Sequence, residues 1–66
     1  GLTAVRAIIG DAGDWLRPGG WLVLEIGHRQ GAAVGALMRG AGLIDVEIRQ
    51  DLAGLDRIAL GRRSAG

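Results

Sequence analysis

The chain has 66 residues, a formal net charge of +1, 48% apolar residues and no cysteine. This length allows one small domain, the apolar content argues against disorder, and the lack of cysteine excludes disulfides and a cysteine-bound metal. The charge is too small to indicate a nucleic-acid partner, and no membrane span or signal-peptide pattern is found, so we expect a cytoplasmic protein.

The first predicted element is a helix over residues 3–16. Its apolar side chains recur at intervals of three and four residues, which is typical of a single helical stripe. Thr3 suits the N-cap, because its hydroxyl can accept a hydrogen bond from an otherwise unpaired backbone N–H. The stripe consists of Val5, Ile8, Ile9, Ala12, Trp15 and Leu16.

A buried strand over residues 21–27 is predicted next. Pro18 disfavours helix at the residue before it, and Gly19–Gly20 supply a turn. The strand is apolar on both faces apart from Glu25, a pattern typical of strands that are covered on both sides. Alternation assigns Leu22, Leu24 and Ile26 to one face and Trp21, Val23 and Glu25 to the other.

The second half of the chain predicts a helix over 30–41 and then two strands. Ile44, Val46 and Ile48 alternate with charged residues, which indicates a strand over 44–50 with one wet face. A loop at 51–56 leads to a last strand at 57–61, which we expect to run antiparallel to its partner. Residues 62–66 complete the chain as a solvated tail, so the folded part is expected to span 1–61.

The resulting fold class is α/β, in the order helix, strand, helix, strand, strand. A right-handed crossover at 21–50 makes its two strands parallel, so we expect a mixed sheet with an antiparallel last strand. Both helices then lie on one face, which leaves the opposite face of strand 21–27 uncovered and its outer edge without a neighbour. The chain therefore resembles the end of a larger domain, and in isolation we expect it to self-associate. We expect Trp15 and Trp21 to lie in the core.

Three polar residues near the end of strand 21–27 are the candidate site residues. Glu25 either contacts a substrate or orients the following loop, or it is a strand-end carboxylate paired with an arginine or a backbone N–H; we favour the pairing. His28 is either a proton carrier or a solvated loop residue, and we favour the latter. Gln30 either binds a ligand or caps the helix that it begins. No metal site, glycine-rich cofactor loop or nucleophile with a base is found.

Two parts of the sequence carry a resemblance to a known family. LRPGGWLVLEIG at 16–27 resembles the fifth strand of a class I S-adenosylmethionine-dependent methyltransferase, a Rossmann-like fold. IGHRQG at 26–31, DLAGLDR at 51–57 and LGRR at 60–63 together resemble the C-terminal end of the PrmC/HemK family, the release factor glutamine methyltransferases. In that family strand 57–61 would lie between 21–27 and 44–50. The chain departs from the family pattern at Arg29 and Leu55.

The resemblance implies an enzyme that methylates the Gly-Gly-Gln glutamine of peptide chain release factors, its protein partners. The family's cofactor loop and its Asn-Pro-Pro-Tyr substrate motif lie upstream and are absent here. No catalytic or cofactor-binding residue is therefore assigned to this chain, which we expect neither to bind S-adenosylmethionine nor to be active alone. Glu25, His28 and Gln30 are left as candidates that act indirectly.

Two alternatives remain open at this point. One is the sister family that methylates a glutamine of a ribosomal protein, or another class I methyltransferase. The other is a non-enzymatic module that self-associates or binds an anionic partner, which would require a folded monomer with salt-sensitive binding.

Overall fold

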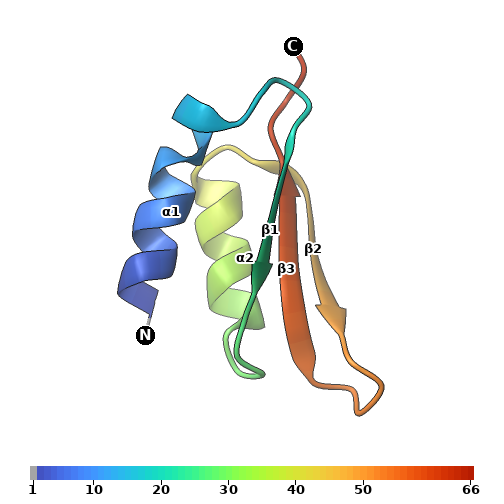
Figure 1. The fold of residues 1–66 in the computed structure, drawn as a ribbon. Helices are drawn as coiled ribbons and strands as arrows, with labels where there is room; N and C mark the ends of the chain where they lie inside the picture. The colour runs from blue at the N-terminus through green and yellow to red at the C-terminus, as the bar shows by residue number, and fades with distance from the viewer. Residues whose placement is uncertain (1) are drawn as a thin grey trace.

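A computed structural model describes residues 2–66 as two helices and three strands. The helices are α1 (Leu2–Trp15) and α2 (Gly31–Gly40), and the strands are β1 (Trp21–Glu25), β2 (Ile44–Gln50) and β3 (Asp56–Arg62) (Figure 1). The predicted order of elements is confirmed. The bounds of β2 agree with the expectation at both ends, and the other elements differ by one or two residues at their ends.

The connection between α1 and β1 is a tight turn at Arg17–Gly20. Gly20 N donates to Arg17 O at 2.7 Å, and Gly19 has a φ of 78°. Proline at the second position and a left-handed glycine at the third are the features of a type II turn. The Pro-Gly-Gly sequence thus ends the helix and reverses the chain into β1.

The sheet has the order β1-β3-β2, and β3 is antiparallel to both of its neighbours. Strands β1 and β2 therefore run in the same direction, as expected for a crossover, but β3 lies between them. The placement of the last strand in the centre is confirmed. The expected mixed sheet is corrected, because every pairing among the described strands is antiparallel and no two parallel strands are neighbours.

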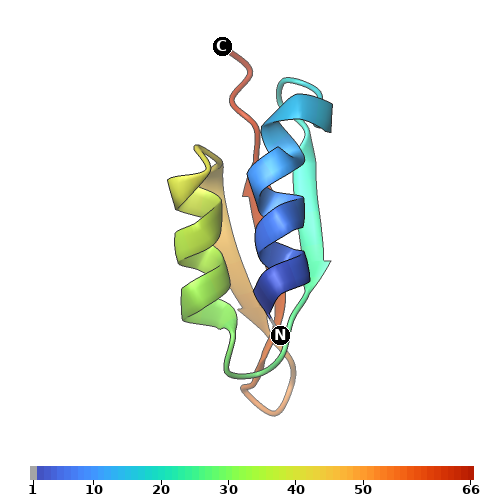
Figure 2. The same ribbon diagram turned by 90° about the vertical axis from the view of Figure 1, so that its left-hand side faces the viewer.

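Both helices pack on one face of the sheet, so the protein has two layers (Figure 2). Val34 and Met38 of α2 are fully buried, as is Ala59 at the centre of β3. Gly61 lets this layer pack closely, since a Cβ there would lie 3.2 Å from Met38 Sδ. The side chains that complete the core are Ile9, Ala12, Leu16, Leu22, Ile26 and Leu43.

The opposite face of the sheet is not covered by any described element. Val23 retains 58% of its exposure and Trp21 45% on this face, while Leu22 on the helix side is buried. Trp15, the last residue of α1, retains 53% of its exposure. The expectation that both tryptophans lie in the core is therefore wrong for this chain, because periodicity identifies residues that share a face but not whether that face is covered.

Strand β2 contains a bulge that changes the facing of its first residue. The register shifts between Ile44 and Glu47, and Asp45 has a φ of 51°. One extra residue in a strand turns the side chains before it to the other face. Val46 and Ile48 consequently pack against the core as expected, whereas Ile44 does not join them and stays exposed.

Residues 62 and 63 are hydrogen-bonded to the rest of the fold, whereas a solvated tail was expected over 62–66. Arg62 is the last residue of β3, and Arg63 exchanges backbone hydrogen bonds with Gly19 and Gly20, both at 2.8 Å. The Arg63 guanidinium donates to Leu16 O at the end of α1, and Arg62 Nε donates to Gly19 O at 3.1 Å. Two cationic side chains thus satisfy carbonyls at the α1–β1 turn, and the exposed end begins at residue 64.

Candidate functional site

Two loops lie together at one end of the sheet because β1 and β2 run in the same direction. The β1–α2 loop (26–30) and the β2–β3 loop (51–55) both project from the lower end in Figure 1. This is the carboxyl end of the two parallel-running strands, where ligands of α/β proteins bind. All three candidate residues belong to the first of these loops or directly precede it.

Glu25 is the last residue of β1 and lies on the uncovered face. It stands opposite Ile58 of β3 in the register and is exposed. Within residues 2–66 its carboxylate has no hydrogen bond or ion pair, so the expected pairing with an arginine or a backbone N–H is not formed among these residues. The carboxylate is available to a group outside them.

The loop at 26–30 is closed by Gln30. Gly27 N donates to the Gln30 side-chain oxygen at 2.8 Å, and Gln30 N donates to Gly27 O at 3.0 Å. Gln30 also occupies the N-cap position of α2, although its side chain makes no cap hydrogen bond there. Its carboxamide oxygen therefore shapes the loop, while His28 between these contacts is exposed.

The start of α2 lies against the β3 end of the second loop. A Cβ at Gly31 would lie 2.2 Å from Asp56 Oδ2 and 3.0 Å from Ile48 Cγ2. Asp56 Oδ1 accepts from Gln50 Nε2 at 3.2 Å. A negative carboxylate beside the first turn of a helix is electrostatically favourable, so Gly31 allows the two loops to approach closely.

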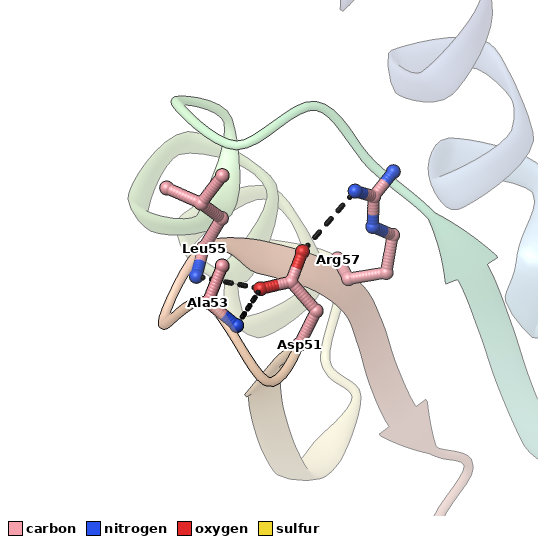
Figure 3. Close-up of polar contacts among 4 residues, drawn as sticks. All are labelled: Asp51, Ala53, Leu55 and Arg57. Carbon is pink, nitrogen blue, oxygen red and sulfur yellow. Dashed lines mark hydrogen bonds and ion pairs between the residues drawn. The ribbon is translucent and has the colours of Figure 1, made fainter.

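Asp51 organises the β2–β3 loop (Figure 3). Its Oδ1 accepts from Ala53 N at 2.9 Å and from Leu55 N at 3.0 Å, and its Oδ2 pairs with Arg57 Nη2 at 3.2 Å. The hydrogen bond from Leu55 N, followed by that from Arg57, lowers the pKa of Asp51 below its ordinary value. This network was not predicted, although an aspartate at the start of an Asp-x-x-Gly loop is a known signal for side-chain bonds to the backbone.

Arg57 connects the two loops. Its carbonyl accepts from Ile26 N at 2.9 Å, at the start of the first loop, and its guanidinium holds Asp51 in the second. The arrangement positions Glu25 and His28 beside a structured loop. In the described part of the chain no group of three metal-binding side chains gathers, and the fold leaves no enclosed cavity.

None of the helices described for residues 2–66 combines the length and the apolar character needed to cross a membrane.

Comparison with known proteins relates the chain to one kind of enzyme. It is 53% identical over 62 residues to a release factor glutamine methyltransferase of Xylella fastidiosa, 51% over 65 residues to one of Cereibacter sphaeroides, and 44% over 62 residues to one of Salmonella typhimurium. These alignments cover 94%, 98% and 94% of this chain. No protein-family model and no solved structure matches it.

The alignments cover much less of the relatives. The chain spans 22% of the Xylella fastidiosa and Salmonella typhimurium proteins and 23% of the Cereibacter sphaeroides protein. The comparison therefore relates this chain to about a fifth of each of these proteins.

Proposed function

We propose that this chain belongs to the release factor glutamine methyltransferases, to which it is similar in sequence, and forms the C-terminal part of such an enzyme's catalytic domain. The whole enzyme transfers a methyl group from S-adenosylmethionine to the side-chain amide nitrogen of the Gly-Gly-Gln glutamine of peptide chain release factors. A release factor substrate also places the protein in the cytoplasm. The observation that carries this proposal is the identity with curated relatives over nearly the whole chain.

The open surfaces of the structure support a role as part of a larger Rossmann-like domain. The outer edge of β1 has no neighbouring strand among the described residues, and Val23 and Trp21 remain exposed on the uncovered face. A further parallel strand on β1 and helices on the second face would bury these side chains, as in doubly covered sheets. Together with the coverage of the relatives, this favours a domain completed by other residues.

We assign the cofactor site to that remainder. The loops at 26–30 and 51–55 do not carry the glycine-rich sequence of a phosphate-binding cofactor loop. The chain's contribution is to hold one wall of the cleft in place. Methyl transfer to an amide nitrogen depends chiefly on holding that nitrogen in line with the donor carbon, so a rigid wall affects the rate without touching the reacting atoms.

Glu25, His28 and Gln30 take positioning roles in this proposal. The Glu25 carboxylate is exposed and has no partner among residues 2–66, so it is assigned to a donor group of the completed domain beside the entering glutamine. Gln30 keeps loop 26–30 closed through its contact with Gly27. His28 is placed at the rim of the cleft, where it stays solvated.

A chimaeric enzyme tests the proposal directly. Residues 2–63 of this chain replace the matching segment of the Xylella fastidiosa relative, and transfer of a labelled methyl group to a purified release factor is measured. We expect activity within about tenfold of the parent enzyme, because a homologous wall should preserve the geometry of the cleft. A release factor whose Gly-Gly-Gln glutamine is replaced by alanine is the control for the site of transfer.

Two results would contradict the proposal. A folded chimaera that binds S-adenosylmethionine but methylates no release factor would exclude this substrate. Methylation of a ribosomal protein in place of the release factor would assign the chain to the sister activity.

A further inference from the structure

Residues 27–30 form a turn that is closed by two hydrogen bonds of opposite direction. The backbone N–H of Gln30 donates to Gly27 O at 3.0 Å, and the backbone N–H of Gly27 donates to the Gln30 side-chain oxygen at 2.8 Å. A glutamine that reaches back to the backbone N–H three residues before it follows the same pattern as one half of a capping box. The side chain of Gln30 therefore determines the shape of the turn that leads into α2.

Gly27 leaves the room that this carboxamide needs. A Cβ at Gly27 would lie 3.2 Å from Gln30 Oε1 and 3.3 Å from Gln30 Cδ, which is closer than ordinary van der Waals contact. An added methyl group would have to displace the carboxamide by a few tenths of an ångström, away from the N–H that it accepts from. The glycine and the glutamine are thus matched to each other across the turn.

The turn is fixed at both of its ends by buried residues. Ile26 before it is 6% exposed, and Gly31 after it is buried. Between them His28 and Arg29 occupy the two corner positions, and both are exposed. Among residues 2–66 no side chain other than that of Gln30 forms a hydrogen bond with the turn. The directions in which the two corner side chains project therefore depend on one carboxamide.

We propose that Gln30 is a positioning residue for methyl transfer, because its side-chain oxygen holds the turn at residues 27–30 in the conformation in which it borders the cleft. This inference rests on the proposed function and makes the rate depend on one hydrogen bond. The turn follows the carboxyl end of β1, directly after Glu25, where ligands of α/β proteins bind (Figure 1). Gln30 acts through Gly27 and makes no contact with the reacting atoms.

The expected effect is on the rate of the reaction. The bond between Gly27 and Gln30 is exposed, so it contributes little to the stability of a whole enzyme. A displacement of about 1 Å beside the reacting atoms can nevertheless lower the rate by roughly 100-fold. A turn that relaxes into several conformations would hold the substrate's amide nitrogen in line with the donor carbon for a smaller share of the time. Such a loss lowers kcat and kcat/KM equally and leaves KM unchanged.

The test compares Gln30→Met with Gln30→Glu in the chimaeric enzyme described above. Methionine has a similar length and no side-chain oxygen, whereas glutamate keeps an oxygen that can accept from Gly27 N. For Gln30→Met we expect kcat on the release factor to fall about tenfold, with KM for the release factor and for S-adenosylmethionine within about twofold. Its melting temperature should stay within about 4 °C of the unsubstituted chimaera. Gln30→Glu should recover kcat to within about threefold.

Gln50→Met is the matched control. Gln50 is the last residue of β2, and its Nε2 donates to Asp56 Oδ1 at 3.2 Å, which is also an exposed hydrogen bond at this end of the sheet. The substitution removes one side-chain hydrogen bond from the neighbouring loop, so it should change the melting temperature as little as Gln30→Met does and leave kcat unaltered. Equal losses of kcat in the two variants would overturn the inference, because the rate would then respond to any loosening of this end of the sheet.

The other outcomes separate this inference from the proposed function. An unsubstituted chimaera that binds S-adenosylmethionine but methylates no release factor overturns both. An active chimaera whose kcat is unaffected by Gln30→Met, or is lowered as much by Gln30→Glu, overturns the positioning role alone. A melting temperature lowered by more than about 4 °C together with the rate in Gln30→Met also overturns it, because the glutamine would then stabilise the fold as a whole.

Discussion

Exchanging two glycines for alanine should change the stability of this chain in opposite directions. Gly10 lies in the middle of α1, and a Cβ added there would have no atom within 4 Å. Gly31 is the first residue of α2, and a Cβ there would lie 2.2 Å from Asp56 Oδ2, 2.9 Å from Asp56 Cγ and 3.0 Å from Ile48 Cγ2. Gly10 therefore reports on helix propensity in open space, and Gly31 reports chiefly on close packing.

The magnitudes follow from two competing effects. Alanine is favoured over glycine in a helix interior by about 0.5–1 kcal/mol, so Gly10→Ala should raise the free energy of unfolding by that amount. At Gly31, the first residue of its helix, this gain is smaller and is outweighed by overpacking, which costs roughly 1–3 kcal/mol. Moving the Asp56 carboxylate aside would disturb its hydrogen bond with Gln50. We therefore expect Gly31→Ala to lower the free energy of unfolding by about 1–2 kcal/mol.

Urea denaturation of the 66-residue chain, followed by far-ultraviolet circular dichroism at low protein concentration, measures both changes. For a domain of this size about 1 kcal/mol corresponds to a shift in melting temperature of roughly 4–8 °C, so the two variants should be clearly separated. The double substitution Gly31→Ala with Asp56→Ala removes the carboxylate and should recover part of the loss. Equal stabilisation by Gly10→Ala and Gly31→Ala would refute the reasoning about close packing.

Three further predictions concern charge, exposure and the cleft. The amide proton shifts of Ala53 and Leu55 should titrate with a midpoint below 3.8, the ordinary pKa of an aspartate, because the pKa of Asp51 is lowered, and they should not titrate in Asp51→Asn. The stabilisation of the loop by this carboxylate is present above pH 3.8 and is lost as the pH falls through the lowered pKa. A midpoint at or above 3.8 would contradict this prediction. The isolated chain should sediment as oligomers that Val23→Asp converts to monomers with unchanged helix content, because a charge on an open edge strand opposes pairing. Glu25→Gln should leave the unfolding free energy of the 66-residue chain within about 0.5 kcal/mol but slow the chimaeric enzyme roughly tenfold; an unchanged rate would remove Glu25 from the site.

The sequence predicted the elements well where a pattern repeats within one element. The alternation in β2 gave its bounds at Ile44–Gln50, and the glycine and proline signals placed the turn before β1. Those patterns are local, because they follow from backbone geometry alone. They also identified the uncovered face of β1, since a crossover of fixed hand places both helices on one side.

The missed features depend on contacts between distant segments. Trp15 and Trp21 were expected in a core that the described chain does not build around them. The bulge at Asp45 has no clear sequence signal, and it moves Ile44 away from the apolar face. Arg63 reaches Leu16 across 47 positions of the chain, a contact that no local pattern could indicate.

The candidate site shows the same difference between features that a local pattern predicts and features that depend on distant segments. The sequence proposed Glu25, His28 and Gln30 as candidates from their place at or after the end of a strand, whereas the side-chain contacts at this end of the sheet centre on Asp51 and Arg57. Their connection exists only because β3 inserts between β1 and β2, which brings Arg57 O within 2.9 Å of Ile26 N while its guanidinium pairs with Asp51. Arg57 therefore contacts both loops. The antiparallel last strand thus links the two loops at this end of the sheet.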